Sequence, residues 1–255
     1  MWILVLALLF IVLLLLFGVL YQYHYYKTSK HGPVLFQQGH DHAPLIIVHG
    51  QPGSGKSTLS QQLASQFNLH YIDIDHHRYH PASQGHIWKT RDIEDFSNQL
   101  LNEIEKIPPQ SQQQQQNKDP VYAQEEMKTE KNGWIIDGTV MATQPPVAPH
   151  ASLVLWLDYS ASVVMFRLFI RTMKRIMFKT PICNGNIETW YNQFCSTQDS
   201  LLLFVLKRFW NWREYESRVV KWMKNNPHLT VYRFQSPYEC EMFLKNNLSK
   251  IISLK

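Results

Sequence analysis

The fold is decided by one stretch, Leu45-Ile46-Ile47-Val48-His49-Gly50-Gln51-Pro52-Gly53-Ser54-Gly55-Lys56-Ser57. An apolar run leads into the pattern GxxxxGK[ST], and a helical pattern follows from Thr58 onward. Glycines let successive backbone amides turn toward a polyphosphate, and the N-terminus of the next helix adds partial positive charge. The stretch therefore predicts a strand, a phosphate loop and a helix that bind a nucleoside triphosphate. The alternative is a glycine-rich turn with a surface lysine, which the flanking strand and helix disfavour.

The loop supplies the residues that we expect to bind the nucleotide. Lys56 is expected to reach the β and γ phosphates, and the Ser57 hydroxyl to coordinate a Mg²⁺ that bridges them. ATP and Mg²⁺ are the expected cofactors. The full expected binding set is Gly50, Gly53, Ser54, Gly55, Lys56, Ser57 and Thr58.

Short apolar runs separated by helical patterns predict the rest of the architecture. Such an alternation favours an α/β fold, a parallel five-stranded sheet with helices on both faces. We expect one domain over residues 44–255. A glutamine-rich insertion at 106–133 cannot bury enough apolar area to order itself, so it is expected to be a surface spacer or a partner-binding tract. The expected strands are 45–48, 71–74, 134–136, 153–157 and 230–234.

Aspartates follow three of these strands, at the sheet edge where ligands bind in open parallel sheets. Asp137 ends the third run and is expected to hold Mg²⁺, with a turn cap as the alternative. Asp73 and Asp75 end the second run, and strand alternation would point both side chains the same way. Asp75 is expected to accept a proton from an acceptor hydroxyl, and Asp73 to support the metal. The alternative is that both only cap the strand and turn.

Histidines and cysteines give weaker signals. His76, His77 and His80 lie near these aspartates, but no spacing among them is diagnostic of a metal site. The three cysteines, with no C-x-x-C pair among them, are expected to be reduced thiols.

Basic residues recur along the helix that follows the fourth strand. Arg167, Arg171 and Arg175 are spaced every four residues, so they lie on one helical face. Arg167 and Arg171 are expected to neutralise charge on the transferred phosphoryl group, with a solvated helix face as the alternative. A second basic set is expected to face water or anionic lipid, and consists of Lys207, Arg208, Arg213, Arg218, Lys221 and Lys224.

The N-terminus predicts a membrane anchor. Residues 2–20 are apolar and uncharged, and as a helix they would span about 29 Å. A cleaved signal peptide is the alternative, but no basic residue precedes the run and no cleavage motif follows it. We expect a transmembrane helix at 1–20 and a tether at 21–43. Lys27 and Lys30 follow the helix, so the protein is expected to be single-pass with its domain in the cytosol.

Together, these residues resemble the P-loop kinases of the adenylate-kinase-related type, and more narrowly the bacterial DNA topology modulation proteins. The resemblance covers residues 45–247 apart from the glutamine-rich insertion. It implies a five-stranded parallel core, binding of ATP and Mg²⁺, and phosphoryl transfer to a small acceptor. One departure is that Thr139-Val140-Met141 stand where adenylate kinases have a phosphate-gripping Phe-Pro-Arg. The residues that carry the resemblance are those of the loop from Gly50 to Ser57, Asp75, Trp134-Ile135-Ile136-Asp137-Gly138, Leu157-Asp158 with Arg167 and Arg171, and Ser236-Pro237 with Phe243-Leu244.

The sequence thus favours a membrane-anchored kinase that phosphorylates a nucleotide, a nucleoside or another hydroxyl compound. Lys56, Asp75, Arg167 and Arg171 are the expected catalytic residues, and Ser57, Asp137 and Asp73 the expected metal ligands. The main alternative is a nucleotide-binding regulatory module or slow NTPase without a small-molecule acceptor. Nucleic acid is not an expected partner, because a net charge of +5 is equally explained by a phosphate site and a membrane surface.

Overall fold

The computed structural model describes residues 34–36, 45–85, 87–105, 133–138, 147–196 and 200–248. The predicted insertion at 106–133, except Gly133, and residues 139–141 lie outside this part of the chain. The described strands are β1 Val34–Phe36, β2 Leu45–Gly50, β3 His70–Asp73, β4 Trp134–Gly138, β5 Leu153–Leu157, β6 Pro181–Ile182, β7 Asn186–Ile187 and β8 Thr230–Phe234. The described helices are α2 Lys56–Phe67, α3 Ile74–Arg78, η1 Ala82–Gln84, α4 Ile93–Glu105, η3 Ala148–His150, α7 Ala161–Phe178, α8 Trp190–Phe194, α9 Leu201–Trp210, α10 Trp212–Lys224, α11 Pro237–Phe243 and η4 Leu244–Leu248.

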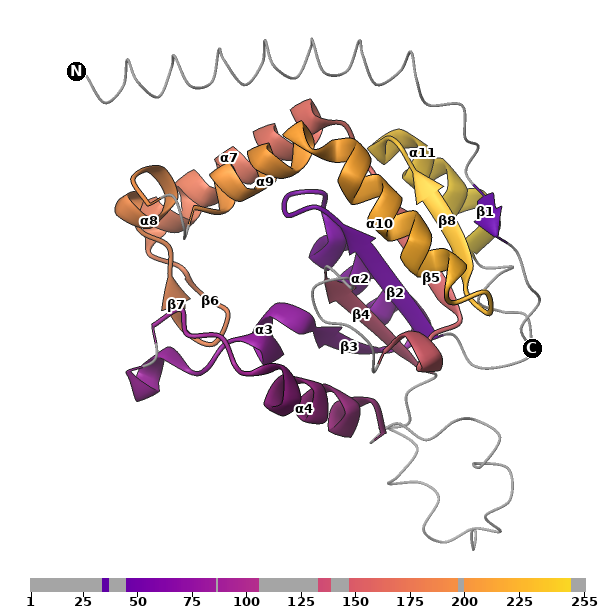
Figure 1. Cartoon of the computed structure of the whole chain (residues 1–255), viewed down its shortest axis with the longest axis horizontal. Coiled ribbons are helices and arrows are strands. Elements are labelled where there is room, and N and C mark those ends of the chain that lie inside the picture. The colour runs from indigo at the N-terminus through magenta and orange to yellow at the C-terminus, as the bar shows by residue number, and fades with distance from the viewer. Residues whose placement is uncertain are drawn as a thin grey trace, which may run out of the picture.

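A six-stranded sheet in the order β1-β8-β5-β2-β4-β3 forms the centre of the fold (Figure 1). The pairs among β8, β5, β2, β4 and β3 are all parallel, so the predicted five-stranded parallel sheet is confirmed. β1 adds an antiparallel edge strand on β8 and lies within the stretch expected to be a tether. Because β2 lies between β5 and β4, its carboxyl end lies beside the ends of both neighbouring strands.

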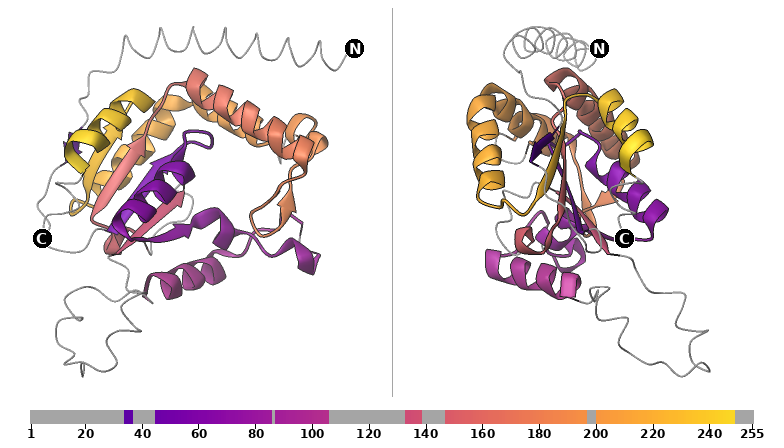
Figure 2. Two further views of the ribbon diagram at one scale, coloured as in Figure 1. Left: turned by 180° about the vertical axis from the view of Figure 1, so that it is seen from behind. Right: turned by 90° about the vertical axis from the view of Figure 1, so that its right-hand side faces the viewer.

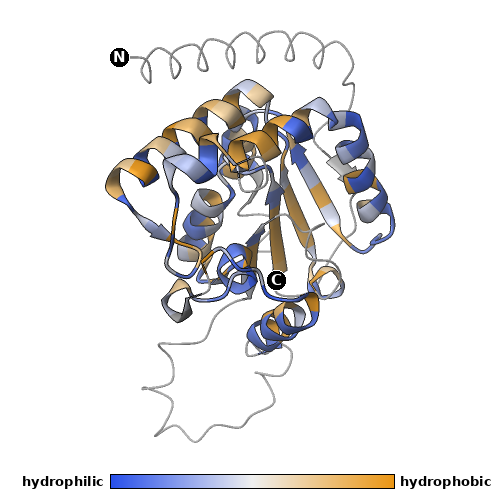
Figure 3. Cartoon of the chain, turned by 60° about the vertical axis from the view of Figure 1, so that its left-hand side comes forward, coloured by the Kyte–Doolittle hydropathy of each residue, from blue (hydrophilic) through white to orange (hydrophobic). Residues whose placement is uncertain are grey.

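The core lies on both faces of the sheet. Continuous burial of β4 and β5 explains why their sequences are apolar without alternation, as is typical of parallel strands covered on both sides. The central strands of the sheet are accordingly coloured mostly as hydrophobic in Figure 3. Seen edge-on, α2 and α11 lie on one side of the sheet and α10 on the other (Figure 2). The predicted helices on both faces are therefore present.

The second predicted strand ends one residue early. β3 stops at Asp73, and Ile74 begins the short helix α3, because Asp73 Oδ1 accepts hydrogen bonds from the backbone N–H groups of Asp75 and His76. Asp75 is therefore helical. The inference that strand alternation points Asp73 and Asp75 the same way is wrong, since only Asp73 belongs to the strand.

The predicted membrane localisation is contradicted. Within the described ranges, no helix combines the length and the apolar character needed to cross a bilayer. α7, the longest described helix, carries Arg167, Arg171, Lys174 and Arg175 along its 18 residues. The predicted anchor at 1–20 lies outside the described residues.

Candidate functional site

The phosphate loop, residues 50–57, begins at the end of β2 and opens directly into α2. Gly53 has φ +89° and Gly55 has φ +98°, which L side chains rarely adopt, and Gly55 is the N-cap of α2. The Lys56 ammonium folds back and donates to the carbonyl of Gln51 at 3.1 Å, and Ser54 N–H donates to the same oxygen at 3.0 Å. The loop is therefore closed on itself, with its amides and its lysine gathered at the N-terminus of α2.

Charged groups from four segments surround the Lys56 ammonium. Burial lowers its pKa, and Arg171 and Arg208 lower it further, whereas Asp75 and Asp137 oppose the shift. Charges influence one another in this way only when they lie close together. The structure thus brings together at Lys56 three of the other residues predicted from sequence, Asp75, Asp137 and Arg171.

Ser57 and Asp137 form the predicted metal pair. The Ser57 side chain hydrogen-bonds to the Asp137 carboxylate, whose residue is 3% exposed at the end of β4. Burial, Asp73 and Asp75 raise the pKa of Asp137 to about 6, against the opposing effects of Ser57 and Lys56. A hydroxyl and a buried carboxylate with further carboxylates nearby fit a Mg²⁺ that takes its remaining ligands from phosphates and water.

No protein-only metal cluster accompanies this pair. Among the residues that the structure describes, no group of three His, Cys, Asp or Glu side chains could hold a metal ion, so His76 and His77 belong to no such group. Asp73 is also the N-cap of α3. Burial and the neighbouring Asp75 raise the pKa of Asp73, against the two backbone hydrogen bonds that it accepts.

The predicted arginines of α7 lie at the loop. Arg167 Nη1 donates to the carbonyl of Ser54 at 3.3 Å. Burial lowers the pKa of Arg171 to about 10, as does Arg175, and Glu188 and Asp75 oppose the shift. Arg175 instead pairs with the buried Glu188 at 3.0 Å. The stripe predicted from sequence therefore divides into two arginines beside the phosphate loop and one that ties α7 to the segment after β7.

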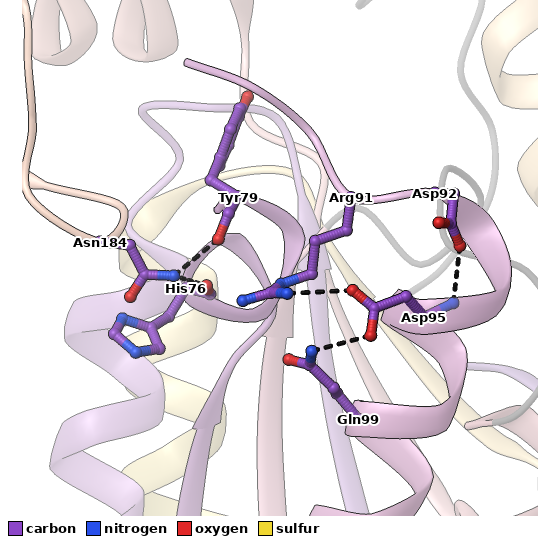
Figure 4. A network of polar contacts seen from close by, with 7 residues as sticks. All are labelled: His76, Tyr79, Arg91, Asp92, Asp95, Gln99 and Asn184. Atoms are coloured by element: carbon purple, nitrogen blue, oxygen red, sulfur yellow. Dashed lines mark hydrogen bonds and ion pairs between the residues drawn. The ribbon is translucent and has the colours of Figure 1, made fainter. Parts of the chain in front are cut away.

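A second wall of the site is built from the α3–α4 segment, residues 74–105, and the β6–β7 hairpin, residues 181–187. Asn184, at the tip of the hairpin, donates to the carbonyl oxygens of His76 at 2.6 Å and Tyr79 at 2.7 Å (Figure 4). Asn186 Oδ1 accepts from the backbone N–H of Trp88 at 2.6 Å. Side-chain amides of the hairpin therefore hold the backbone of the α3–α4 segment.

This wall also carries its own ion pair and aromatic contact. Arg91, just before α4, pairs with Asp95 of that helix at 2.9 Å (Figure 4). The rings of Tyr79 and Trp88 meet edge to face, with centroids 5.5 Å apart. Burial raises the pKa of the hairpin's Cys183 to about 12, and Asp75 and Asp73 raise it too, which indicates that the hairpin faces these carboxylates.

Sequence reasoning missed three residues of the site. Gln51 is 2% exposed and offers both its backbone and side-chain oxygens to cations. Tyr71 reaches Ser57 and Gln61 by side-chain hydrogen bonds. Arg208, expected to face water or lipid, lies instead at the loop, where its Nη1 donates to Gln51 Oε1 at 3.4 Å. Helical periodicity within α9 contains no signal for this contact, since Gln51 is 157 positions away in sequence.

Comparisons with known proteins find a family model over the loop and short matches among kinases. A family model described as "Chromatin associated protein KTI12" matches residues 43–107, which is less than half of the chain. Shikimate kinases of Xylella fastidiosa strains M12 and M23 are 44% identical over 34 residues, which are 13% of this chain and 19% of theirs. The match thus spans about a fifth of the length of these curated relatives. These two findings support a P-loop kinase-like, nucleotide-binding fold.

Two solved structures are similar at a lower level. A shikimate kinase from Bacteroides thetaiotaomicron is 14% identical with a TM-score of 0.37, over 82% of this chain and 98% of that one. A sugar kinase from Janibacter sp. HTCC2649 is 16% identical with a TM-score of 0.30, over 68% of this chain and 95% of that one. TM-scores this low carry no argument about function. The narrower resemblance to DNA topology modulation proteins stays a prediction.

Proposed function

We propose that the chain transfers the γ-phosphoryl group of Mg-ATP to a hydroxyl of a small molecule. The observation that carries the proposal is the gathering of Asp75, Asp137 and Arg171 around the Lys56 ammonium. A site that only held a nucleotide would need the loop and a metal ligand. A further carboxylate and a guanidinium near the lysine add a base for the acceptor hydroxyl and a positive charge for the transferred group.

Each group would act through position and charge. The loop amides and Lys56 would hold the phosphates, while Ser57 and Asp137 would hold Mg²⁺ and Asp73 would support it. Asp75 would accept the proton of the acceptor hydroxyl as its oxygen bonds to the γ phosphorus and the bond from that phosphorus to the bridging oxygen breaks, which releases ADP. Arg167 and Arg171 would stabilise the negative charge on the transferred group.

The experiment is a phosphoryl-transfer screen with the full chain, [γ-³²P]ATP and Mg²⁺, against nucleosides, nucleotides, sugars and carboxylated polyols. We expect a labelled product that Lys56→Ala abolishes and Asp75→Asn lowers by about 100-fold, the size typical of a lost general base. Lys221→Ala, an exposed lysine of α10, is the matched control and should leave product formation unchanged. Product formation that survives Lys56→Ala would overturn the proposal.

A second candidate is a nucleotide-binding regulator. It is favoured by the family model, whose description names a chromatin-associated protein and whose match covers both the loop and the α3–α4 segment. Asp75 separates the two functions. If Asp75→Asn leaves nucleotide binding and ATP hydrolysis at wild-type levels, and no acceptor yields product, the regulatory function is the better account.

A further inference from the structure

Arg208 of α9 holds an unusual position for a surface-helix arginine. Its guanidinium lies over the rings of Tyr215 at 4.4 Å and Phe204 at 4.8 Å, and Nη1 reaches Gln51 in the phosphate loop. Two cation–π contacts at these distances restrain a long side chain that would otherwise sample many rotamers. The guanidinium is therefore fixed against the loop.

Arg208 also differs from the structural arginines of the molecule in its charge partners. Arg175 and Arg91 are paired with Glu188 and Asp95 at 3.0 and 2.9 Å. Among the described residues, no carboxylate pairs with Arg208, and burial, its largest influence, lowers its pKa. A half-buried guanidinium that is held by neutral rings keeps its charge available for an anion.

A buried hydrogen bond sets the ring under Arg208. Tyr215 OH and His49 Nε2 are 2.9 Å apart, and both residues are at most 2% exposed. Burial, together with Lys56 and Arg208, lowers the pKa of His49 to about 3, so the imidazole is neutral at physiological pH. A neutral His49 adds no charge next to Lys56 and anchors Tyr215 to β2, the strand that carries the loop.

Arg208 and Lys56 converge on the same residue from two sides. Lys56 donates to the backbone oxygen of Gln51 and Arg208 to its side-chain oxygen. In a phosphate loop the lysine reaches the β and γ phosphates. We propose that Arg208 is a further triphosphate-binding residue that contacts the terminal phosphates beside Lys56, and that the Tyr215–His49 pair is the positioning device that aims it. This inference rests on the proposed function.

The test compares the affinities of the full chain for Mg-ATP and Mg-ADP by titration calorimetry. Arg208→Gln is expected to weaken ATP binding about 10- to 100-fold, the range of a lost charged hydrogen bond, and ADP binding by less than a third of that factor. Lys207→Gln, the exposed neighbour on α9, removes the same charge and is the matched control. Tyr215→Phe keeps the ring and removes the hydroxyl, and should lower the ATP-to-ADP preference about threefold.

Phe204→Leu keeps the test decisive if Arg208→Gln does not fold, because the Phe204 ring is 47% exposed and contributes little to the core. It should also lower the preference for ATP over ADP. Equal losses for ATP and ADP, or an Arg208→Gln variant that matches Lys207→Gln, would overturn the inference. If the wild type and Lys56→Ala bind ATP alike, the proposed function fails instead, so the two failures are distinguishable.

Discussion

The two walls of the site are built in opposite ways. The phosphate loop wall is contiguous in sequence, and β2 fixes it through parallel pairing with β4 and β5. The opposite wall joins the α3–α4 segment to a hairpin about 100 positions later, through side-chain amides that bind backbone groups. The first wall is part of the core and the second is attached to it. Mutations should therefore affect the first through folding and nucleotide binding, and the second through local opening.

The largest effect is expected from Asp137→Asn. This variant tests whether the carboxylate that binds the metal in the loop wall also lowers the folding stability of the protein. Removing the carboxylate should weaken Mg²⁺-dependent nucleotide binding by about 100-fold, as loss of a ligand position commonly does. Binding of the nucleotide without Mg²⁺ should change little. Calorimetric titrations with and without Mg²⁺ measure both affinities.

The same variant should be more stable than the wild type at pH 7. The folded pKa of Asp137, about 6, lies above the value of 3.8 for a free carboxyl, so ionisation of Asp137 favours the unfolded chain. The neutral form contributes stability below pH 3.8 that is lost as the pH rises through 6. Asn removes this loss, and thermal unfolding at pH 7 and pH 4 should show a gain only at pH 7. A destabilised variant at pH 7 would contradict this account.

Gly53→Ala tests the packing of the loop wall against α7. An added Cβ would lie 2.7 Å from the Val164 carbonyl oxygen and 2.9 Å from Leu168 Cβ, on a backbone with φ +89°. We expect a cost of about 3 kcal/mol in the free energy of unfolding, with nucleotide affinity falling in parallel. Gly85→Ala is the matched control, because φ is +77° there but nothing lies within 4 Å of the new Cβ. Urea denaturation of both variants should separate the clash from the backbone strain.

The contrast between the walls also explains what the sequence could predict. The five parallel strands and the loop were predictable because apolar runs and glycine spacing are local signals, and β2, β4 and β5 are buried almost throughout. The end of the second strand was less predictable, because the Asp73 side chain accepts local backbone hydrogen bonds that end the strand and begin α3.

Contacts between residues far apart in the chain could not be predicted from the sequence. Arg208 shares the composition of a solvated basic face, and only the packing of α9 and α10 over the loop brings it to Gln51. Asn184 and Asn186 look like ordinary turn residues, yet their side chains bind backbone groups of the α3–α4 segment. Every residue has such backbone groups, so the sequence does not show which of them an asparagine will bind.

A pH titration of Mg-ATP binding tests whether Asp137 of the loop wall holds Mg²⁺, and its expected effect is of intermediate size. Because the Asp137 carboxylate must be ionised to hold Mg²⁺, and its pKa is raised to about 6, Mg-ATP affinity should fall about tenfold between pH 7 and pH 5. Asp137→Asn should show a flat profile over this range. A fall that persists in the variant would assign the titration to another group.

The smallest effect is expected from Asn184→Gly, which tests the attached wall alone. Asn184 has φ +65°, so glycine fits the backbone and the substitution removes only the side-chain hydrogen bonds to His76 and Tyr79. At about 0.5 kcal/mol for each of the two hydrogen bonds, the low end of the usual range, local opening should become about fivefold more frequent. Hydrogen exchange of the Ala82 and Trp88 amides, which are bonded to the hairpin, measures that opening.

Exchange in α2 and the affinity for Mg-ATP should stay at wild-type values, because within the described ranges the hydrogen bonds of Asn184 go to the α3–α4 segment. Asn225→Gly, at the exposed end of α10, is the matched control and should leave both regions unchanged. If Asn184→Gly raises exchange in α2 as well, the hairpin transmits its state through Arg175 and Glu188 to α7 and the loop. The walls would then open as one cooperative unit, and their different construction would have no consequence for how the site moves.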